Sequence, residues 1–563
     1  MKKLFLTLAV VAVAVTSCQK EIAYDDTYLV SVSGDNSSRI VGGDDIGQLY
    51  PYELNVTDSL PNPYSISNMR LAYESACEKY GESVFGNFSI DNIGLSHYYV
   101  KFEPNTEEQL DKLVEYFNNR GVIFFDYPLH CETYGEGMVK SSLTGIMPLY
   151  ACIQCNITLP YFCNYTILDN IYMPDDQIGT IATLNANGIP INAMEILIDE
   201  AYCLVGEEST RTNEKWTPNG RLMVWDDLLC RAVPLEGVKV VARNGFKIAV
   251  GYTDENGYFS VNKTFNRNVK YSIIWEDSKW DIRRGTLGQA KFHNGNKTYN
   301  SWNVTFDNNH EAENYAHIHR ALRYHFYSGY PGLDQVSSDR KVKVAYLNQV
   351  NNTKLGQFNI ELPIGGPICD ITVFGKTSGE ISDIYGQLVH SYYIIGTVLH
   401  ELGHASMYTQ IGKRAYNNTE LILRESWAAF VCWLQTTDFY ELYGCGNLIQ
   451  GTRNGSAVDS PNFFNIQSWW KDSGVAGTPM IIDIFDNNNQ RQNAINNDDS
   501  YQRDYLQYPN DFISINLFTG NIEIIKQLVY TSQTKDEFMD NFKGKIKLFL
   551  ISLSNYEKYA SSY

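Results

Sequence analysis

The first part of the chain alternates between segments with a two-residue hydrophobic repeat and segments with a helical repeat. Residues 98–102 and 122–125 have the composition of strands, and residues 107–118 between them place apolar side chains at helical spacing. This order predicts an α+β domain over residues 49–215, either an accessory domain or a purely structural one. Residues 18–48 before it are polar and rich in Asp, Ser and Gly, which is typical of a tether.

Between residues 226 and 295 the pattern changes to short alternating strands. The expected strands are 238–242, 248–250, 258–261 and 271–274, and Asp254-Glu255-Asn256-Gly257 supplies a turn. The run from Leu235 to Val238, followed by the run from Gly251 to Phe259, is similar to the carboxypeptidase regulatory-like domain, a small β-sandwich. That resemblance implies a spacer or binding adaptor and says nothing about carboxypeptidase activity.

Residues 300–563 carry longer apolar helices with two strands between them. The pattern predicts an amphipathic helix over 314–327, strands at 343–347 and 369–374, and a helix over 391–411 that Gly412 ends. Apolar runs at 477–484, 521–529 and 536–551 predict a mainly helical C-terminal part. The whole chain is therefore expected to be a multidomain α+β protein.

The N-terminus has the features of a bacterial export signal. Met1-Lys2-Lys3 precedes an apolar run over 4–15, and small residues lead to Cys18. We expect a lipoprotein signal peptide over residues 1–17, with Cys18 lipidated; an ordinary secretory signal or an uncleaved helix is the alternative. Gln19-Lys20-Glu21 resembles the start of Bacteroidetes surface lipoproteins, which implies a lipid-anchored protein at the outer membrane and cell surface.

The net charge and the spacing of the cysteines limit which partners and which cysteine states are expected. The 563 residues carry a formal net charge of -19, which argues against nucleic acid as a partner. Export into an oxidising compartment makes disulfides plausible. Cys152, Cys155 and Cys163 lack a nearby fourth ligand for a structural zinc, so disulfides or buried thiols are favoured there. Cys432 either pairs with Cys445 or is a free thiol in the core.

The candidate chemistry lies in the segment Val398-Leu399-His400-Glu401-Leu402-Gly403-His404. Residues four apart project from one face of a helix, so His400 and His404 can offer two imidazoles to one metal ion. Glu401 lies one step round the helix, where its carboxylate can take a proton from an attacking water. This is the HExxH pattern, and it predicts a hydrolytic zinc site.

Such a site needs a third protein ligand. Met407 and Gln410 stand where a metzincin would have Gly and His, which excludes that class. Glu425 lies in a strongly apolar helical run, where an unpaired carboxylate would be costly to bury. It is the expected third ligand. Glu420 is a rival, and a surface pairing of Glu425 with Arg424 is the alternative without a metal.

These residues resemble the thermolysin-like gluzincins, whose third ligand is a Glu on a second helix some twenty or more residues on. The resemblance covers residues 300–435 and implies a zincin domain over 300–563, with an upper subdomain whose edge strand pairs with substrate and a mainly helical lower subdomain. The implied activity is a zinc metallopeptidase acting on a protein or peptide, with Zn²⁺ held by His400, His404 and Glu425 and Glu401 as general base.

The chain departs from the gluzincin pattern at two points. Ala429 stands where that family often has an acidic partner for an imidazole, so another residue must orient the ring. No histidine follows His404, so a tyrosine would have to stabilise the oxyanion. Candidates for this role are Tyr440, Tyr443, Tyr501, Tyr505 and Tyr508. The remaining histidines in this region, His317, His319, His325 and His390, are expected to be packing or surface residues, and Asp483 either supports the metal site or is structural.

A second function stays open at this point. A non-catalytic surface lipoprotein could bind protein or glycan through its first two domains and keep a structural or vestigial metal site. The intact His400, Glu401 and His404 favour the enzyme, because a purely structural site has no need of Glu401.

Overall fold

The computed structural model describes most of the chain between residues 62 and 548. The described ranges are 62–117, 120–129, 148–174, 193–206, 215–285, 298–307, 311–337, 341–351, 356–359, 369–376, 389–445, 480–485 and 521–548, with the short pieces 55–56, 133–134, 288–289 and 291–293. The expected signal peptide, Cys18 and the tether lie outside these residues.

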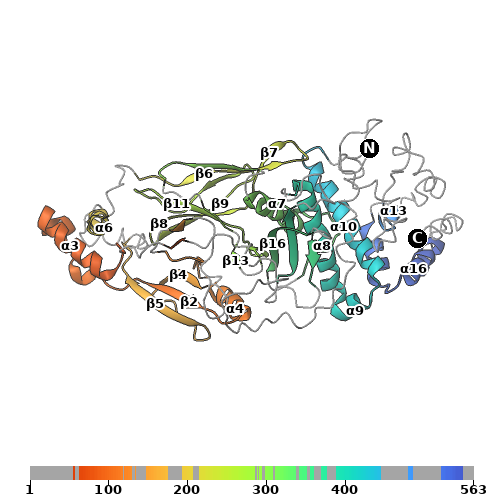
Figure 1. Ribbon diagram of the computed structural model, residues 1–563, viewed down its shortest axis with the longest axis horizontal. Coiled ribbons are helices and arrows are strands. Elements are labelled where there is room, and N and C mark those ends of the chain that lie inside the picture. Colours follow the sequence, from red (N-terminus) through yellow and green to blue (C-terminus); the bar gives the residue numbers. More distant parts are fainter. Residues whose placement is uncertain are drawn as a thin grey trace, which may run out of the picture.

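The protein is a mixed α and β molecule with several sheets, elongated along the axis that lies horizontal in Figure 1. Helices α3 (Ile66–Tyr80) and α6 (Ala193–Leu204) lie at one end and the C-terminal helices at the other, and the sheets lie between them. Within the described ranges, no helix has the length and hydropathy that crossing a membrane requires.

The N-terminal region contains a three-stranded antiparallel sheet. Its strand order is β4-β2-β5, and the strands span His97–Glu103 (β2), Leu149–Gln154 (β4) and Asn164–Ile171 (β5). Helix α4 (Glu107–Phe117) packs its apolar side on this sheet and buries Phe102, Leu113 and Phe117 together. The other elements of the region are α3 (Ile66–Tyr80), α6 (Ala193–Leu204), two 3₁₀ turns (Glu82–Phe85 and Ile90–Asn92) and the paired strands β1 (Asn55–Val56) and β3 (Thr133–Tyr134).

The expected strand at 122–125 is wrong. Only Phe125 makes a bridge, exchanging backbone hydrogen bonds with Tyr150 at 2.9 and 2.7 Å. The residues before it leave a turn at Gly121, whose φ of 67° lies in the left-handed region. The apolar side chains of this segment are partly or fully buried although the segment does not form a strand. A buried loop and a strand can show the same short run of apolar residues.

Two four-stranded sheets follow and share one hydrophobic core (Figure 1). One has the order β10-β6-β15 with β7 paired to β6, and the other has the order β14-β11-β8-β9. The strands are β6 (Asn219–Asp226), β7 (Arg231–Pro234), β8 (Lys239–Asn244), β9 (Lys247–Tyr252), β10 (Tyr258–Ser260), β11 (Lys270–Ile274), β14 (Lys291–His293) and β15 (Trp302–Phe306). The four strands expected from the sequence are confirmed.

The turn expected at 254–257 is also present. The backbone N–H of Gly257 donates to the carbonyl of Asp254 at 2.9 Å, and Gly257 has a φ of 80° that other residues rarely adopt. The pairing crosses the expected limits of 226 and 295, because β15 from beyond residue 295 pairs with β6. Strands β12 (Trp280–Arg284) and β13 (Gly288–Gln289), inside those limits, belong to a different sheet.

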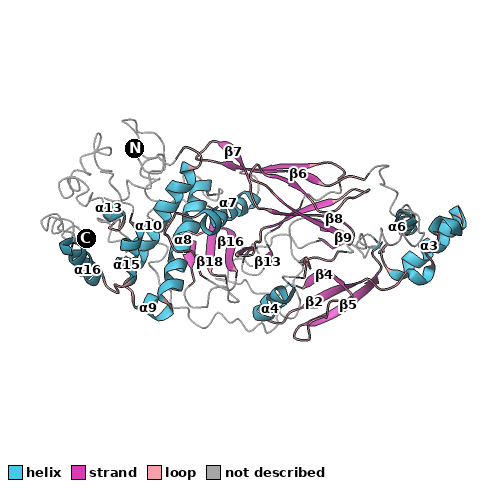
Figure 2. Ribbon diagram, turned by 180° about the vertical axis from the view of Figure 1, so that it is seen from behind, coloured by secondary structure: helices cyan, strands magenta, loops and turns pink. Residues whose placement is uncertain are grey.

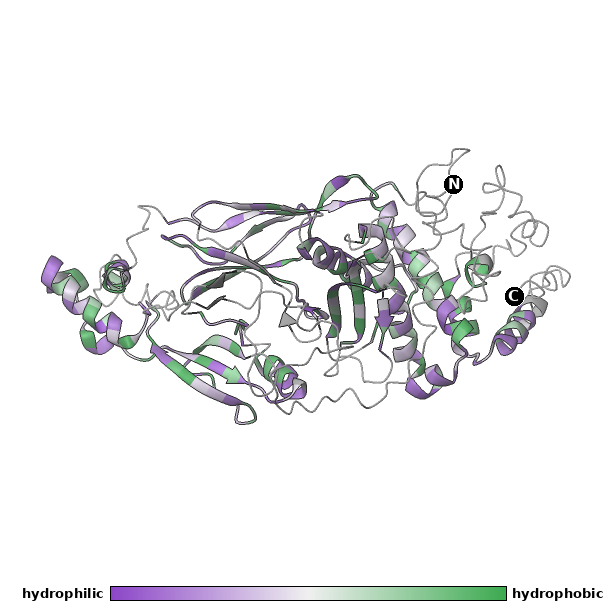
Figure 3. Cartoon of the chain, in the orientation of Figure 1, coloured by the Kyte–Doolittle hydropathy of each residue, from purple (hydrophilic) through white to green (hydrophobic). Residues whose placement is uncertain are grey.

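That sheet has five strands in the order β13-β12-β16-β18-β17. Strands β12, β16 and β18 are parallel to their neighbours in this set, whereas β13 and β17 run antiparallel at the two ends. Its further strands are β16 (Val342–Val350), β17 (Gly356–Phe358) and β18 (Ile371–Lys376). The strand expected at 343–347 lies within β16, and the strand expected at 369–374 begins two residues later, at Ile371. The first half of β16 is buried, and Figure 3 shows the strands beside α8 as largely hydrophobic.

Helices pack on this sheet and continue into the C-terminal region (Figure 2). They are α7 (Glu311–Arg323, followed by a π-helical turn at Tyr324–Ser328), α8 (Ser391–Ile411), α9 (Lys413–Asn418), α10 (Leu421–Glu441), α13 (Ile482–Phe485), α15 (Ile522–Tyr530) and α16 (Lys535–Leu548). The α8 bounds are those expected from the sequence, and Gly412 with a φ of 82° ends the helix.

The nine cysteines in the described ranges carry free thiols. Cys163 is buried, Cys152 is half-buried and Cys155 is exposed. Cys432 is buried on α10, where its Sγ donates to the carbonyl of Gly396 at 3.2 Å. Cys432 is therefore a free thiol in the core and does not pair with Cys445. Of Cys152, Cys155 and Cys163, only Cys163 is the expected buried thiol.

Candidate metal centre

Helices α8 and α10 run antiparallel and in close contact at the centre of the site. Gly403 makes the contact possible, since a Cβ atom there would lie 3.1 Å from both Cα of Ala428 and Cβ of Val431. A larger residue would push the helices apart. This close approach places Glu425, one turn before Ala428, opposite His404.

His400, His404 and Glu425 meet between these two helices. Nε2 of His400 lies 3.4 Å from Oε2 of Glu425, and Nε2 of His404 lies 3.5 Å from Oε1. The three ligand atoms lie within 4.8 Å of one another and all three residues are buried. Ligands at about 2.0–2.2 Å from a tetrahedral ion lie roughly 3.3–3.5 Å apart, so the spacing suits one ion between them.

The polar atoms at this centre are buried without ordinary hydrogen bonds. Nε2 of His400 and both carboxylate oxygens of Glu425 have no hydrogen-bond partner within the described ranges. Leaving such groups unsatisfied costs about 1–3 kcal/mol each, and more for a charge. A cation held between them would satisfy all of these atoms, so the residues present fit a metal ion.

The protonation states of Glu425 and His404 also suit a metal. Burial opposes the charge of Glu425, but the imidazoles of His404 and His400 hold its pKa well below the usual range of a glutamate. Burial lowers the pKa of His404, which favours the neutral ring that binds metals. Burial also opposes the charge of His400, yet Glu425 and Glu401 keep its pKa above the usual value.

Glu401 lies on the same helix as the two histidines and is fully buried. Its carboxylate lies against the backbone of β17, because a Cβ atom on Gly356 would come within 2.7 Å of Oε1 of Glu401. The same atom would come within 2.4 Å of Cγ2 of Thr397. Only a glycine therefore lets β17 pass this close to the carboxylate.

Tyr416 supplies the orienting partner that the sequence left unassigned. Its hydroxyl lies 2.9 Å from Nδ1 of His404, and the tyrosine is 2% exposed. Phe358 of β17 lies parallel to the His404 ring, with an interplanar angle of 9°. Tyr416 sits on the short helix α9, so its distance from His404 depends on the turn at Gly412. No motif in the sequence marks it.

Other candidates from the sequence lie elsewhere. Glu420 precedes α10 and accepts a hydrogen bond from the backbone of Lys535 at 2.7 Å, so the structure does not bring it to the ligand cluster. The hydroxyls of Tyr440 and Tyr443 contact Asp226 and Arg320 instead of the ligands. Tyr501, Tyr505, Tyr508 and the side chain of Asp483 lie outside the described residues.

The histidines of α7 are packing residues. His317, His319 and His325 are at most 2% exposed, and burial lowers the pKa of both His319 and His325 to about 4. His319 lies edge-on to Trp275 and Trp280, with ring centroids 5.8 and 5.5 Å away. The lowered pKa keeps His319 and His325 neutral at ordinary pH, and all three side chains are enclosed as packing residues.

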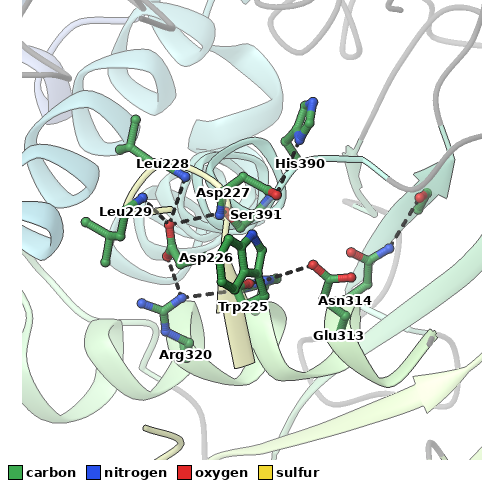
Figure 4. Close-up of polar contacts among 12 residues, drawn as sticks. Trp225, Asp226, Asp227, Leu228, Leu229, Glu313, Asn314, Arg320, His390 and Ser391 are labelled. Atoms are coloured by element: carbon green, nitrogen blue, oxygen red, sulfur yellow. Dashed lines mark hydrogen bonds and ion pairs between the residues drawn. The ribbon is translucent and has the colours of Figure 1, made fainter. Parts of the chain in front are cut away.

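A polar network holds the first turn of α8 (Figure 4); Asp226, Arg320 and Ser391 are buried in it, and His390 is exposed. The carboxylate of Asp227 accepts from the backbone N–H of Ser391 at 2.8 Å and lies 3.3 Å from Nδ1 of His390. Asp226 beside it accepts from Arg320 of α7 at 2.7 Å. Residues from the loop after β6 thereby fix the start of the helix that carries His400 and His404.

Comparison with known proteins gives no further guide. No family model, curated protein or solved structure matches this chain. The assignment of the site therefore depends on its residues and geometry.

Proposed function

We propose that the protein is a zinc-dependent hydrolase that cleaves peptide bonds, with His400, His404 and Glu425 as metal ligands and Glu401 as general base. The observation that carries this proposal is the buried His400–His404–Glu425 cluster with Glu401 beside it on α8. Two histidines and one glutamate form a donor set used by catalytic zinc, which keeps a fourth position for water or substrate. A purely structural site would use four protein ligands.

The residues of the chain would divide the reaction between them. Bound zinc would supply an activated water and polarise the scissile carbonyl. Glu401 would take the proton from the attacking water and deliver it to the leaving nitrogen. Glu425, ionised in this environment, would balance part of the metal charge. Tyr416 would keep the His404 ring in the orientation that presents Nε2 to the ion.

A peptide is the favoured substrate because of the strand beside the site. β17 is the last strand of its sheet among the described residues, and its Gly356 contacts the general base. An extended peptide can add to such an edge through backbone hydrogen bonds, which would bring its carbonyl groups close to Glu401. The proposed domains are a gluzincin-like domain over residues 300–563, preceded by a β-sandwich and by an N-terminal α+β domain that is pro-domain-like or accessory. The sheets cross the proposed limit at residue 300, because β12 joins the sheet beside α8 and β15 joins the sandwich.

The proposed location follows from the N-terminal sequence alone. With a signal peptide over 1–17 and a lipid on Cys18, the protein would be exported, anchored in the outer membrane and exposed at the cell surface, where its substrates would be extracellular proteins or peptides.

One observation favours the alternative of a non-catalytic binding protein with a structural or vestigial metal site. His400, Glu401, His404 and Glu425 are each 4% exposed or less.

The deciding experiment compares wild type with Glu401→Gln on an unbiased peptide library in the presence of zinc. We expect wild type to cleave and Glu401→Gln to lose about 10²–10⁴-fold in kcat, with zinc still bound. Glu441→Gln, at the exposed end of α10, is the matched control and should cleave like wild type. A zinc-loaded wild type that cleaves nothing, or a fully active Glu401→Gln, would contradict the proposal.

A further inference from the structure

Arg424 on α10 is a buried cation without an anion. The residue is 8% exposed, and no hydrogen bond or ion pair to its guanidinium is found within the described ranges. The two nearest carboxylates along the chain are engaged elsewhere, since Glu425 faces the two histidine ligands and Glu420 accepts from the backbone of Lys535. A buried charge that is left unpaired is costly, so the presence of this one needs an explanation.

The guanidinium of Arg424 lies beside the metal ligands. It is held over the ring of Tyr416, 5.1 Å from the ring centroid, and the hydroxyl of Tyr416 lies 2.9 Å from Nδ1 of His404. Of the three guanidinium nitrogens, only Nε is completely enclosed without a partner in the described part of the chain. The two terminal nitrogens are therefore the ones that can donate to a ligand.

The strand β17 leads from the general base towards this cation. Gly356 contacts Glu401, and Phe358 lies two residues further on the same face of the strand, with its ring 6.3 Å from that of Tyr416. A peptide that pairs with β17 and passes Glu401 would reach Tyr416 and the guanidinium over it after about two residues, which span roughly 7 Å.

We propose that Arg424 is a specificity-determining residue that binds a carboxylate of the peptide substrate, about two residues from the scissile bond. A guanidinium recognises a carboxylate through two parallel N–H···O bonds, which would supply the anion that Arg424 lacks. Two sources share this chemistry: an acidic side chain of the peptide and its free C-terminus. This inference rests on the proposed function, because it names the substrate class of the same centre.

The test is digestion of a random peptide library by zinc-loaded, full-length wild type, Arg424→Gln and Arg424→Lys, with the cleaved bonds identified by mass spectrometry. We expect wild type to favour bonds at a fixed distance from a carboxylate, Arg424→Gln to lose that preference, and Arg424→Lys to keep part of it because the charge remains. A second library with amidated C-termini separates the two sources. A preference that disappears there belongs to the free C-terminus, and one that persists belongs to an acidic side chain.

Kinetics then distinguish recognition from a structural role. The rates are measured on one preferred peptide and on its counterpart with an amide in place of the carboxylate. Loss of hydrogen bonds to a charged group should cost roughly 10–100-fold in kcat/KM, so Arg424→Gln should lose that factor on the acidic peptide and little on the neutral one. Arg414→Gln, at an exposed arginine of α9, is the matched control and should behave like wild type on both peptides.

Failure of this inference and failure of the proposed function give different results. Cleavage by wild type without a carboxylate preference, a preference unchanged in Arg424→Gln, or equal losses on the acidic and neutral peptides would overturn the inference alone. A zinc-loaded wild type that cleaves neither library would overturn the proposed function and this inference with it. The wild-type preference and Arg424→Lys decide the matter if Arg424→Gln does not fold or loses its zinc.

Discussion

At the scale of single residues, the hydroxyl of Tyr416 lies at Nδ1 of His404, on the side of the ring opposite to the nitrogen that faces Glu425. Loss of an outer contact of this kind typically lowers metal affinity by about 10–100-fold. We predict that loss for Tyr416→Phe, measured by competition for zinc with a chelator of known affinity. The fold should persist, because the ring keeps its packing.

Tyr408→Phe is the control for this prediction. Its ring lies 5.5 Å from that of Tyr416 and 5.8 Å from that of Phe358, so it belongs to the same aromatic group without touching a ligand nitrogen. Its zinc affinity should equal that of wild type. Equal losses in the two variants would mean that packing, and not the hydrogen bond to His404, sets the affinity.

Gly356 offers a test of the general base that leaves the metal ligands intact. In Gly356→Ala the new Cβ would come within 2.7 Å of Oε1 of Glu401 and displace that carboxylate. Misplacement of a catalytic group by about 1 Å can cost roughly 10²-fold in rate. We predict a loss of that order in kcat with zinc content unchanged. Gly94→Ala, which opens into empty space, should have wild-type activity in the same peptide assay.

The sequence was sufficient for part of this site and insufficient for the rest. His400, Glu401 and His404 could be predicted together because one helix sets their spacing, and Glu425 because a lone buried carboxylate needs a partner. Tyr416 could not, since its distance from His404 depends on how α9 leaves α8. The contact of Gly356 with Glu401 depends on strand pairing, which no local pattern encodes.

At the scale of elements, Asp227 controls the start of α8 through the backbone N–H of Ser391 and through His390. The hydrogen bond to Asp227 raises the pKa of His390 above its usual value, against the opposing effect of burial. Because the pKa of His390 is higher in the folded protein than in the unfolded protein, protonation of this ring stabilises the fold. The stabilisation is complete below the pKa of the unfolded protein and is lost as the pH rises through the pKa of the folded protein.

We therefore predict a pH-dependent effect of His390→Asn. The variant should melt at a lower temperature than wild type at pH 6 and close to wild type at pH 9, both measured by circular dichroism with excess chelator. A difference from wild type that is the same at both pH values would show that the Asp227–His390 pair does not titrate as described.

Elements were predicted best where one local signal defined them. The bounds of α8 follow from its apolar run and from Gly412, and the 254–257 turn from its Asp-Gly chemistry. The segment 122–125 misled because its apolar side chains are buried in a loop. Burial and strand pairing produce the same pattern over so few residues.

At the scale of the whole molecule, α4 of the N-terminal region is tied to the five-stranded sheet by ion pairs. Asp111 of α4 pairs with Lys343 of β16 and lies 3.4 Å from Nη2 of Arg283 on β12. Both cations are buried, at 5% and 6% exposure. The N-terminal region is therefore held to the sheet that supports α8 as well as to the sandwich strands.

Asp111→Asn should weaken this attachment. The substitution removes the carboxylate that balances two buried cations. Removing one partner of a fully buried ion pair costs about 3–5 kcal/mol. We expect a cost of about 2 kcal/mol here, because the Asp111 side chain is 20% exposed. Limited proteolysis should release the N-terminal region faster than in wild type. Glu108→Gln, on the exposed side of the same helix, should not change the rate. Equal rates for both variants would contradict the role of Asp111.

The arrangement of the sheets could not be derived from the sequence. Local patterns located β8 to β11, but the pairings of β15 with β6 and of β12 with β16 join segments far apart in the chain. Such pairings depend on the packing of the whole core. The coarse expectation of a mixed α and β molecule with several sheets is confirmed.

The most direct test of the central claim is zinc content by elemental analysis of purified wild type, Glu425→Ala and Glu420→Ala, each checked for folding by its thermal melt. We predict stoichiometric zinc in wild type and in Glu420→Ala, because the carboxylate of Glu420 accepts from the backbone of Lys535 and is not part of the ligand cluster, and a large loss in Glu425→Ala. Wild type without zinc, or Glu425→Ala that keeps it in full, would contradict the assignment of the metal centre.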